Sequence, residues 1–101
     1  MMAKNPLDTP RDRKFTREEL MEALRLSIIA ELDAINMYSQ FARACEGRFR
    51  EVFEDVAKEE KTHVGEFLAL LKALDSEQAA ELKAGEREVR ELTGLEESES
   101  K

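Results

Sequence analysis

The sequence has few of the residues that interrupt helices or cross-link small domains. Its 101 residues include 4 Gly, 2 Pro, no Trp and a single cysteine, Cys45. One cysteine excludes an intrachain disulfide and is compatible with a reducing compartment. The sequence also lacks a membrane-spanning apolar run, and no signal segment opens it. We therefore expect a cytoplasmic protein with no membrane partner.

Positive charge is also scarce, because 23 acidic residues outnumber 16 basic ones and give a net charge of -7. This balance argues against nucleic acid as the main partner, since phosphate binding needs a basic face. The acidic balance suits a protein that attracts cations, although solubility explains it equally well. The composition, 42% hydrophobic and 39% charged, is typical of a soluble helical protein.

Apolar residues recur with helical spacing in two long segments and, more sparsely, in a third. We predict helices over about residues 16–46, 48–75 and 77–92. They form one helical domain, residues 15–93, between a flexible lead-in, residues 1–14, and a disordered acidic tail, residues 94–101. Two long helices of one small copy cover little of their own apolar surface, so we expect self-association.

Local signals mark the ends of the two long helices. Thr16 and Glu19 match a capping box at the start of the first helix. Gly47 is the natural left-handed residue for ending it. Because the connection is very short, the two long helices are expected to pack antiparallel.

The third helix has weaker signals. Asp75 or Ser76 can cap it, and Gly85 is the expected break within it. Its apolar positions are too sparse for a third core layer. We therefore expect this helix to dock loosely on a neighbour or to project outward.

Charged residues interrupt the apolar seams of the two long helices at three positions. Each seam advances by alternating steps of four and three residues, a period of 3.5. The first seam comprises Leu24, Ile28, Glu31, Ile35, Tyr38, Ala42 and Cys45. The second seam comprises Phe49, Phe53, Val56, Glu60, His63, Phe67, Leu70 and Leu74. The exceptions are Glu31, Glu60 and His63, and a metal ion is the first candidate to compensate charges in such positions.

An antiparallel hairpin brings these three exceptions to one level. Glu31 lies sixteen residues before Gly47, and Glu60 and His63 lie thirteen and sixteen residues after it. The three positions therefore differ by no more than about one helical turn, or about 5.4 Å.

The three residues are half of a known kind of metal centre. A carboxylate-bridged pair of ions in a four-helix bundle needs a Glu from each of two helices and a Glu-x-x-His from each of two others. A two-fold dimer of this chain supplies that set for two ions. Carboxylate oxygens with one imidazole per ion suit Fe²⁺, and Mn, Zn or Ca can serve as substitutes or secondary ions. The predicted reaction is the oxidation of Fe²⁺ to Fe³⁺ by O₂.

Three nearby residues have simpler alternative interpretations. Tyr38, beyond Glu31 on the same seam, is predicted to orient a ligand or donate an electron, and a core tyrosine is the alternative. Asp33 and Glu59 lie off the seams. Glu59 is interpreted as a solvated residue or one that supports a ligand from outside the site, and Asp33 as a surface residue that is also a candidate for drawing cations towards the site.

Residues 29–38, followed by Glu59-Glu60-Lys61-Thr62-His63, resemble the encapsulated ferritins, and the match covers roughly residues 16–92. The resemblance implies an all-α fold, in which an antiparallel two-helix hairpin plus a short C-terminal helix dimerises into a ferritin-like four-helix bundle. It implies that the dimers assemble into a ring, a decamer, inside an encapsulin nanocompartment. It also implies ferroxidase activity that supplies iron for storage within that shell.

Carried over by position, the resemblance implies that Glu31, Glu60 and His63 are iron ligands and that Tyr38 lies beside them. The family often has an acidic residue directly before the ligand glutamate, where this chain has Ala30. Asp33 remains as the candidate for an outer cation site.

Two other functions fit the same residues. A structural hairpin would oligomerise through its seams, with Glu60 and His63 hydrogen-bonding across the dimer. A metal-carrying or buffering protein would bind the ion without redox turnover. A haemerythrin-type site is excluded, because it needs several histidines and this chain has one.

Overall fold

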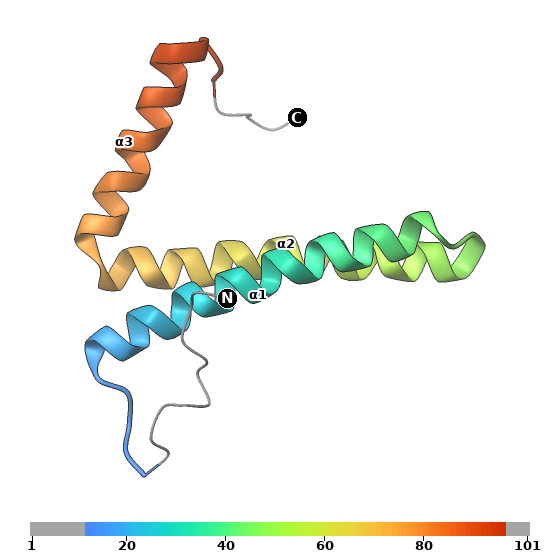
Figure 1. Ribbon diagram of the computed structural model, residues 1–101, viewed down its shortest axis with the longest axis horizontal. Coiled ribbons are helices and arrows are strands. Elements are labelled where there is room, and N and C mark those ends of the chain that lie inside the picture. The colour runs from blue at the N-terminus through green and yellow to red at the C-terminus, as the bar shows by residue number, and fades with distance from the viewer. Residues whose placement is uncertain (1–11, 97–101) are drawn as a thin grey trace.

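The computed structural model describes residues 12–96, which form three helices and contain no strand (Figure 1). Helix α1 spans Arg17–Arg43, α2 spans Gly47–Leu74 and α3 spans Ser76–Thr93. The prediction of an all-α fold is confirmed. Residues 1–11 of the predicted lead-in and residues 97–101 of the predicted tail lie outside the described residues.

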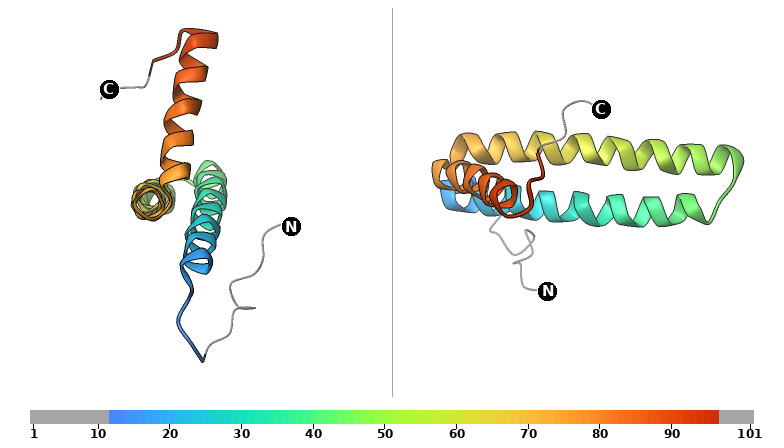
Figure 2. Two further views of the ribbon diagram at one scale, coloured as in Figure 1. Left: turned by 90° about the vertical axis from the view of Figure 1, so that its left-hand side faces the viewer. Right: turned by 90° about the horizontal axis from the view of Figure 1, so that it is seen from above.

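Helices α1 and α2 form an antiparallel hairpin and lie side by side along their lengths (Figure 2). The first helix ends at Arg43, earlier than predicted, because its last turn tightens: the amide of Ala44 donates to the carbonyls of Gln40 and Phe41, and that of Cys45 to the carbonyl of Ala42. Gly47 has the expected positive φ of 61°, but it does not end α1, whose C-cap is Ala44; it is the first residue of α2.

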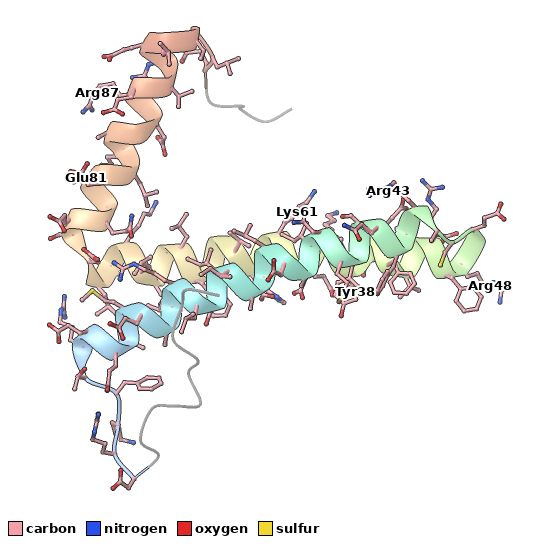
Figure 3. All side chains as sticks on the ribbon, in the orientation of Figure 1. Tyr38, Arg43, Arg48, Lys61, Glu81 and Arg87 are labelled. Atoms are coloured by element: carbon pink, nitrogen blue, oxygen red, sulfur yellow. The ribbon has the colours of Figure 1, made fainter. Side chains whose placement is uncertain are left out.

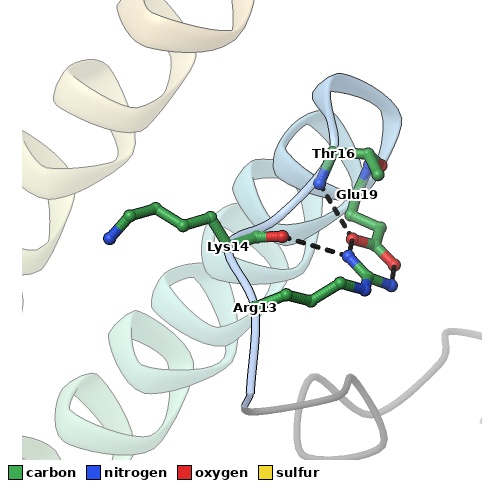
Figure 4. A network of polar contacts seen from close by, with 4 residues as sticks. All are labelled: Arg13, Lys14, Thr16 and Glu19. Carbon is green, nitrogen blue, oxygen red and sulfur yellow. Dashed lines mark hydrogen bonds and ion pairs between the residues drawn. The ribbon is translucent and has the colours of Figure 1, made fainter.

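The start of α1 is held by the predicted capping box, which an additional arginine reinforces (Figure 4). The Thr16 hydroxyl accepts from the Glu19 amide at 3.1 Å, and the Glu19 carboxylate accepts from the Thr16 amide at 2.9 Å. The Arg13 guanidinium donates to both oxygens of the same carboxylate, at 2.7 and 2.9 Å. Hydrogen bonding from Arg13, followed by that from Thr16, lowers the pKa of Glu19 to about 2.

Helix α3 leaves the end of the hairpin and projects away from it (Figure 1). Asp75 caps it, its carboxylate accepting from the Gln78 amide at 2.9 Å. The predicted break at Gly85 is wrong, because α3 runs through this residue without interruption. A glycine costs only about 1 kcal/mol inside a helix, and the helix formers on both sides outweigh that cost. The helix ends instead at Gly94, whose φ is 76°.

Two arginines of α1 hold the junction between α2 and α3. The Arg17 guanidinium donates to the Leu74 carbonyl, the last of α2. The Arg25 guanidinium binds the Asp75 carboxylate, and its Nε donates to the Gln78 side chain at 3.3 Å. The direction of α3 is therefore tied to the start of α1.

One copy of the chain buries little apolar surface. In residues 12–96, the buried hydrophobic side chains are those of Leu24, Ala42, Ala57 and Leu71. Large apolar side chains on the hairpin stay at least about two-fifths exposed, among them Ile29, Leu32, Met37, Phe41, Phe49, Val52 and Leu70. Such extended apolar exposure is typical of a surface that another chain covers. None of the helices in the described residues combines the length and the apolar run needed to cross a bilayer.

Candidate metal centre

Helix α1 supplies one carboxylate to a cluster in the middle of the hairpin. Glu31 lies halfway along α1, on the seam that faces α2, with its side chain 17% exposed. The turns on either side contribute the half-buried Ile28 and Ile35 to the same seam. Glu31 is therefore held as a charged group among apolar neighbours.

Helix α2 supplies the other two side chains. Glu60 and His63 are three residues apart and share one face of the helix. His63 Nδ1 lies 2.7 Å from Glu60 Oε1 and 3.0 Å from Glu31 Oε2. Donor atoms from all three side chains lie within 4.8 Å of one another, so the structure brings the three predicted residues together.

The carboxylates act on the protonation of the imidazole. Hydrogen bonding to Glu60 raises the pKa of His63, and the negative charges of Glu31 and Glu60 add to this effect, while partial desolvation opposes it. Both carboxylates face the same nitrogen, Nδ1, so a proton on that atom occupies the point where the three side chains converge. A cation bound there has to displace this proton.

The donor set fits a hard or borderline divalent cation. Two carboxylates and one imidazole are ligands for Fe²⁺, Mn²⁺ and Zn²⁺. The carboxylate side chains are mostly covered, but the His63 side chain remains 44% exposed. Three ligands leave a cation of this type with open positions, and the exposed imidazole shows that one side of the cluster faces outward.

Tyr38 lies farther along α1 than the cluster. It follows Glu31 by seven residues, about 10.5 Å along the helix axis. Its ring stacks on Phe53 of α2 with a centroid distance of 6.1 Å and meets Phe41 edge-on at 6.3 Å. The structure therefore places the Tyr38 ring in an aromatic cluster with Phe41 and Phe53. This cluster lies about two helical turns along α1 from Glu31.

The remaining predicted residues lie outside the cluster. Asp33 is exposed, because two residues correspond to about 200° around a helix and turn it away from Glu31. Ala30 is exposed and has no side-chain donor. Glu59 is exposed, as its position off the seam predicts.

The sequence matches the Rubrerythrin family over residues 22–99, and the chain belongs to this family. Two similar proteins carry names that refer to encapsulin. A ferritin-like-encapsulin shell fusion protein of Pyrococcus furiosus is 60% identical over 97 residues, which cover 95% of this chain and 28% of that protein. EncC, an encapsulin nanocompartment cargo protein of Myxococcus xanthus, is 38% identical over 90 residues, covering 88% of this chain and 69% of that protein.

A solved structure agrees with these relatives. The crystal structure of the encapsulated ferritin domain from Pyrococcus furiosus superposes with a TM-score of 0.84 and 58% identity, covering 96% of this chain and 100% of that chain. The predicted ferritin-like fold and the predicted resemblance to encapsulated ferritins are therefore confirmed. The chain spans less than a third of the Pyrococcus fusion protein, 28% of its length.

Proposed function

We propose that this chain is a ferroxidase subunit that oxidises Fe²⁺ to Fe³⁺ with O₂ at a di-iron centre shared by two copies. The observation that carries the proposal is the convergence of Glu31, Glu60 and His63, from two helices, to within 4.8 Å. Membership of a ferritin-like family supports an iron-related role for this cluster.

The ligand count supports a site that two copies complete. One chain offers two carboxylates and one imidazole, so a two-fold pair offers four carboxylates, whose charge balances two divalent ions. The outward side of the cluster, marked by the 44% exposed His63 side chain, is where a second copy would contribute its ligands. Iron bound at this position would supply the redox chemistry, in which Fe²⁺ is oxidised to Fe³⁺ and O₂ is reduced.

Each residue has a distinct part in this proposal. Glu60 and His63 would hold one ion from a single helix face, and Glu31 would bind it from the facing helix. Tyr38 is proposed to act beside the centre, by orienting a ligand or donating an electron. Asp33 is proposed to draw cations towards the cluster through its surface charge.

The setting of the reaction is also part of the proposal. One relative is named as an encapsulin shell fusion protein and another as an encapsulin nanocompartment cargo protein. By analogy, we propose that this domain works in the cytoplasm inside an encapsulin shell, which stores the oxidised iron. Within it, homodimers are proposed to assemble into a ring, a decamer.

Substitution of the three ligands tests the activity. Glu31→Ala, Glu60→Ala and His63→Ala are each expected to abolish Fe²⁺-dependent O₂ consumption. Anaerobic Fe²⁺ binding is expected to fall from about one ion per chain to well below it. Glu59→Ala is the matched control, because it removes an adjacent carboxylate from the exposed side of the same helix. Normal turnover in all three ligand variants would refute the proposal.

One observation favours a structural alternative. His63 is already hydrogen-bonded to Glu60 and lies 3.0 Å from the Glu31 carboxylate, as a histidine that only joins two helices would. Under that alternative, removing metal with a chelator leaves the melting temperature unchanged, and Glu60→Leu with His63→Leu raises it. Under the ferroxidase proposal, chelation lowers the melting temperature. Tight Fe²⁺ uptake without O₂ consumption would instead indicate a metal buffer.

A further inference from the structure

A shallow hollow lies in the groove between α1 and α2, near the connection between these helices. Its floor includes Ala42 of α1 and Ala57 of α2, which are only 3% and 6% exposed. Because their methyl groups are short, a volume of about 330 Å³ stays open above them. This is many times the roughly 30 Å³ that one water molecule takes in the liquid.

Positive side chains line this hollow from both helices. Arg43 comes from α1, and Lys58 and Lys61 come from α2, where a spacing of three residues places them on one face. In Figure 3, Arg43 and Lys61 extend from one side of the hairpin and Tyr38 from the other. The hollow therefore lies on the side away from the aromatic cluster.

These three cations have no anionic partner in the described part of the chain. Across residues 12–96, the ion pairs involve other basic side chains. One carboxylate, that of Glu54, lines the hollow, but Arg50 holds it at 3.1 Å. The hollow is therefore lined mainly by positive charge, in a chain with a net charge of -7.

We propose that this hollow, the Arg43–Lys58–Lys61 groove, binds a small inorganic oxyanion such as phosphate. The guanidinium of Arg43 offers a planar fork that matches two oxygens of such an ion, and the lysine ammonium groups add compact charges. Ser39 also lines the hollow and brings a hydroxyl that can donate to a further oxygen. The anion would give the three cations a counter-charge.

Titration of the metal-free full chain with inorganic phosphate tests this inference. In calorimetry at low ionic strength, Lys58→Gln with Lys61→Gln is expected to weaken phosphate binding by about 10-fold or more, because two charged partners are lost. Both lysines are exposed, so the variant keeps the fold. Arg43→Gln is expected to weaken binding as well, whereas Lys61→Arg, which keeps the charge, is expected to retain it.

The matched control removes two cations elsewhere. Lys83→Gln with Arg87→Gln makes the same change of charge on exposed positions of α3 and is expected to leave phosphate binding nearly unchanged. An equal loss in this control would show a general effect of net charge and overturn the groove. Unchanged binding in the Lys58 and Lys61 variant would overturn it too.

The inference does not depend on the ferroxidase proposal. His63→Ala removes a proposed iron ligand that lies two residues after Lys61, about 200° around α2 from it, and is expected to bind phosphate as the unmodified chain does. Loss of phosphate binding in the groove variants with normal Fe²⁺ oxidation would support the groove alone. Phosphate binding that disappears in His63→Ala would place the anion at the metal cluster and refute the groove.

Discussion

Arg25 in the first helix binds Asp75, the residue whose carboxylate caps the third helix. One oxygen of Asp75 accepts from the guanidinium and the other accepts from the Gln78 amide. A single side chain therefore both starts α3 and joins it to α1, across fifty residues of sequence.

Removal of this ion pair is expected to loosen α3. Arg25→Ala should lower the free energy of unfolding by about 1 kcal/mol, the upper range for a partly exposed pair, and should speed amide exchange in the first turn of α3. Asp75→Asn should behave similarly, because asparagine still caps a helix but carries no charge for Arg25. Arg87→Ala, on the exposed part of α3, serves as the control. Exchange rates that do not change in α3 would mean that the pair contributes nothing there.

The protonation of His63 predicts opposite pH dependences for stability and for metal binding. Its pKa is raised above 6.5, so its pairing with Glu60 and Glu31 stabilises the metal-free fold fully below pH 6.5 and is lost as the pH rises through the raised pKa. A cation must displace the proton on Nδ1, so affinity for Mn²⁺, which does not oxidise readily, should increase across the same interval.

Thermal unfolding and Mn²⁺ titration, each as a function of pH, measure these two trends. His63→Asn, which cannot take up a proton, should flatten both curves. A metal-free melting temperature that rises with pH in the unmodified chain, relative to His63→Asn, would contradict the assignment.

The hydroxyl of Tyr38 can be separated from its ring. Tyr38→Phe keeps the stacking on Phe53 and the edge contact with Phe41, so the melting temperature should stay nearly the same. Because we propose that the hydroxyl acts beside the iron centre, we expect Fe²⁺ oxidation to slow several-fold in Tyr38→Phe. Tyr38→Ala should in addition lower the melting temperature, because a partly buried ring is lost. Equal oxidation rates in Tyr38→Phe and the unmodified chain would leave Tyr38 as a packing residue.

The exposed apolar surface of the hairpin predicts that stability depends on protein concentration. A fold that is completed by association unfolds at a higher temperature when the concentration rises. We therefore expect the melting temperature of the metal-free chain to increase when the protein concentration is raised about 100-fold. Sedimentation should show the loss of higher assemblies at the dilute end. A melting temperature independent of concentration would mean that one copy is stable by itself.

The hairpin and the cluster were predictable because they follow from local periodicity and counting. The seam spacing placed Glu31 on the face of α1 that meets Glu60 and His63 of α2, and Gly47 fixed where the chain reverses. The seam was only partly right for α2, where the buried residues Ala57 and Leu71 lie outside it and the seam residues Phe49 and Leu70 are exposed. Glu31 and His63 were then equidistant from that point. The uninterrupted course of α3 through Gly85 was not predictable, because the small cost of one glycine had to be weighed against the whole helix.

Other features depend on contacts between distant residues. Arg25 gave no sequence signal for its role, since its partner Asp75 becomes a neighbour only when α2 returns beside α1. The Arg43–Lys58–Lys61 groove was also missed. The three-residue spacing of Lys58 and Lys61 indicated a shared helix face. That the small side chains of Ala42 and Ala57 meet beneath them follows only once the register of α1 on α2 is known.

The connection between α1 and α2 contains only the three residues between Arg43 and Gly47. Because this connection is so short, it cannot absorb a residue inserted in either helix, and each inserted residue turns the side chains that follow it by about 100° around the helix axis. An insertion within α2 before Glu60 would swing that carboxylate and His63 out of reach of Glu31 without altering one donor atom. The number of residues that separate Glu31 from Glu60 is thus as strict a requirement for this cluster as the chemical identity of its side chains.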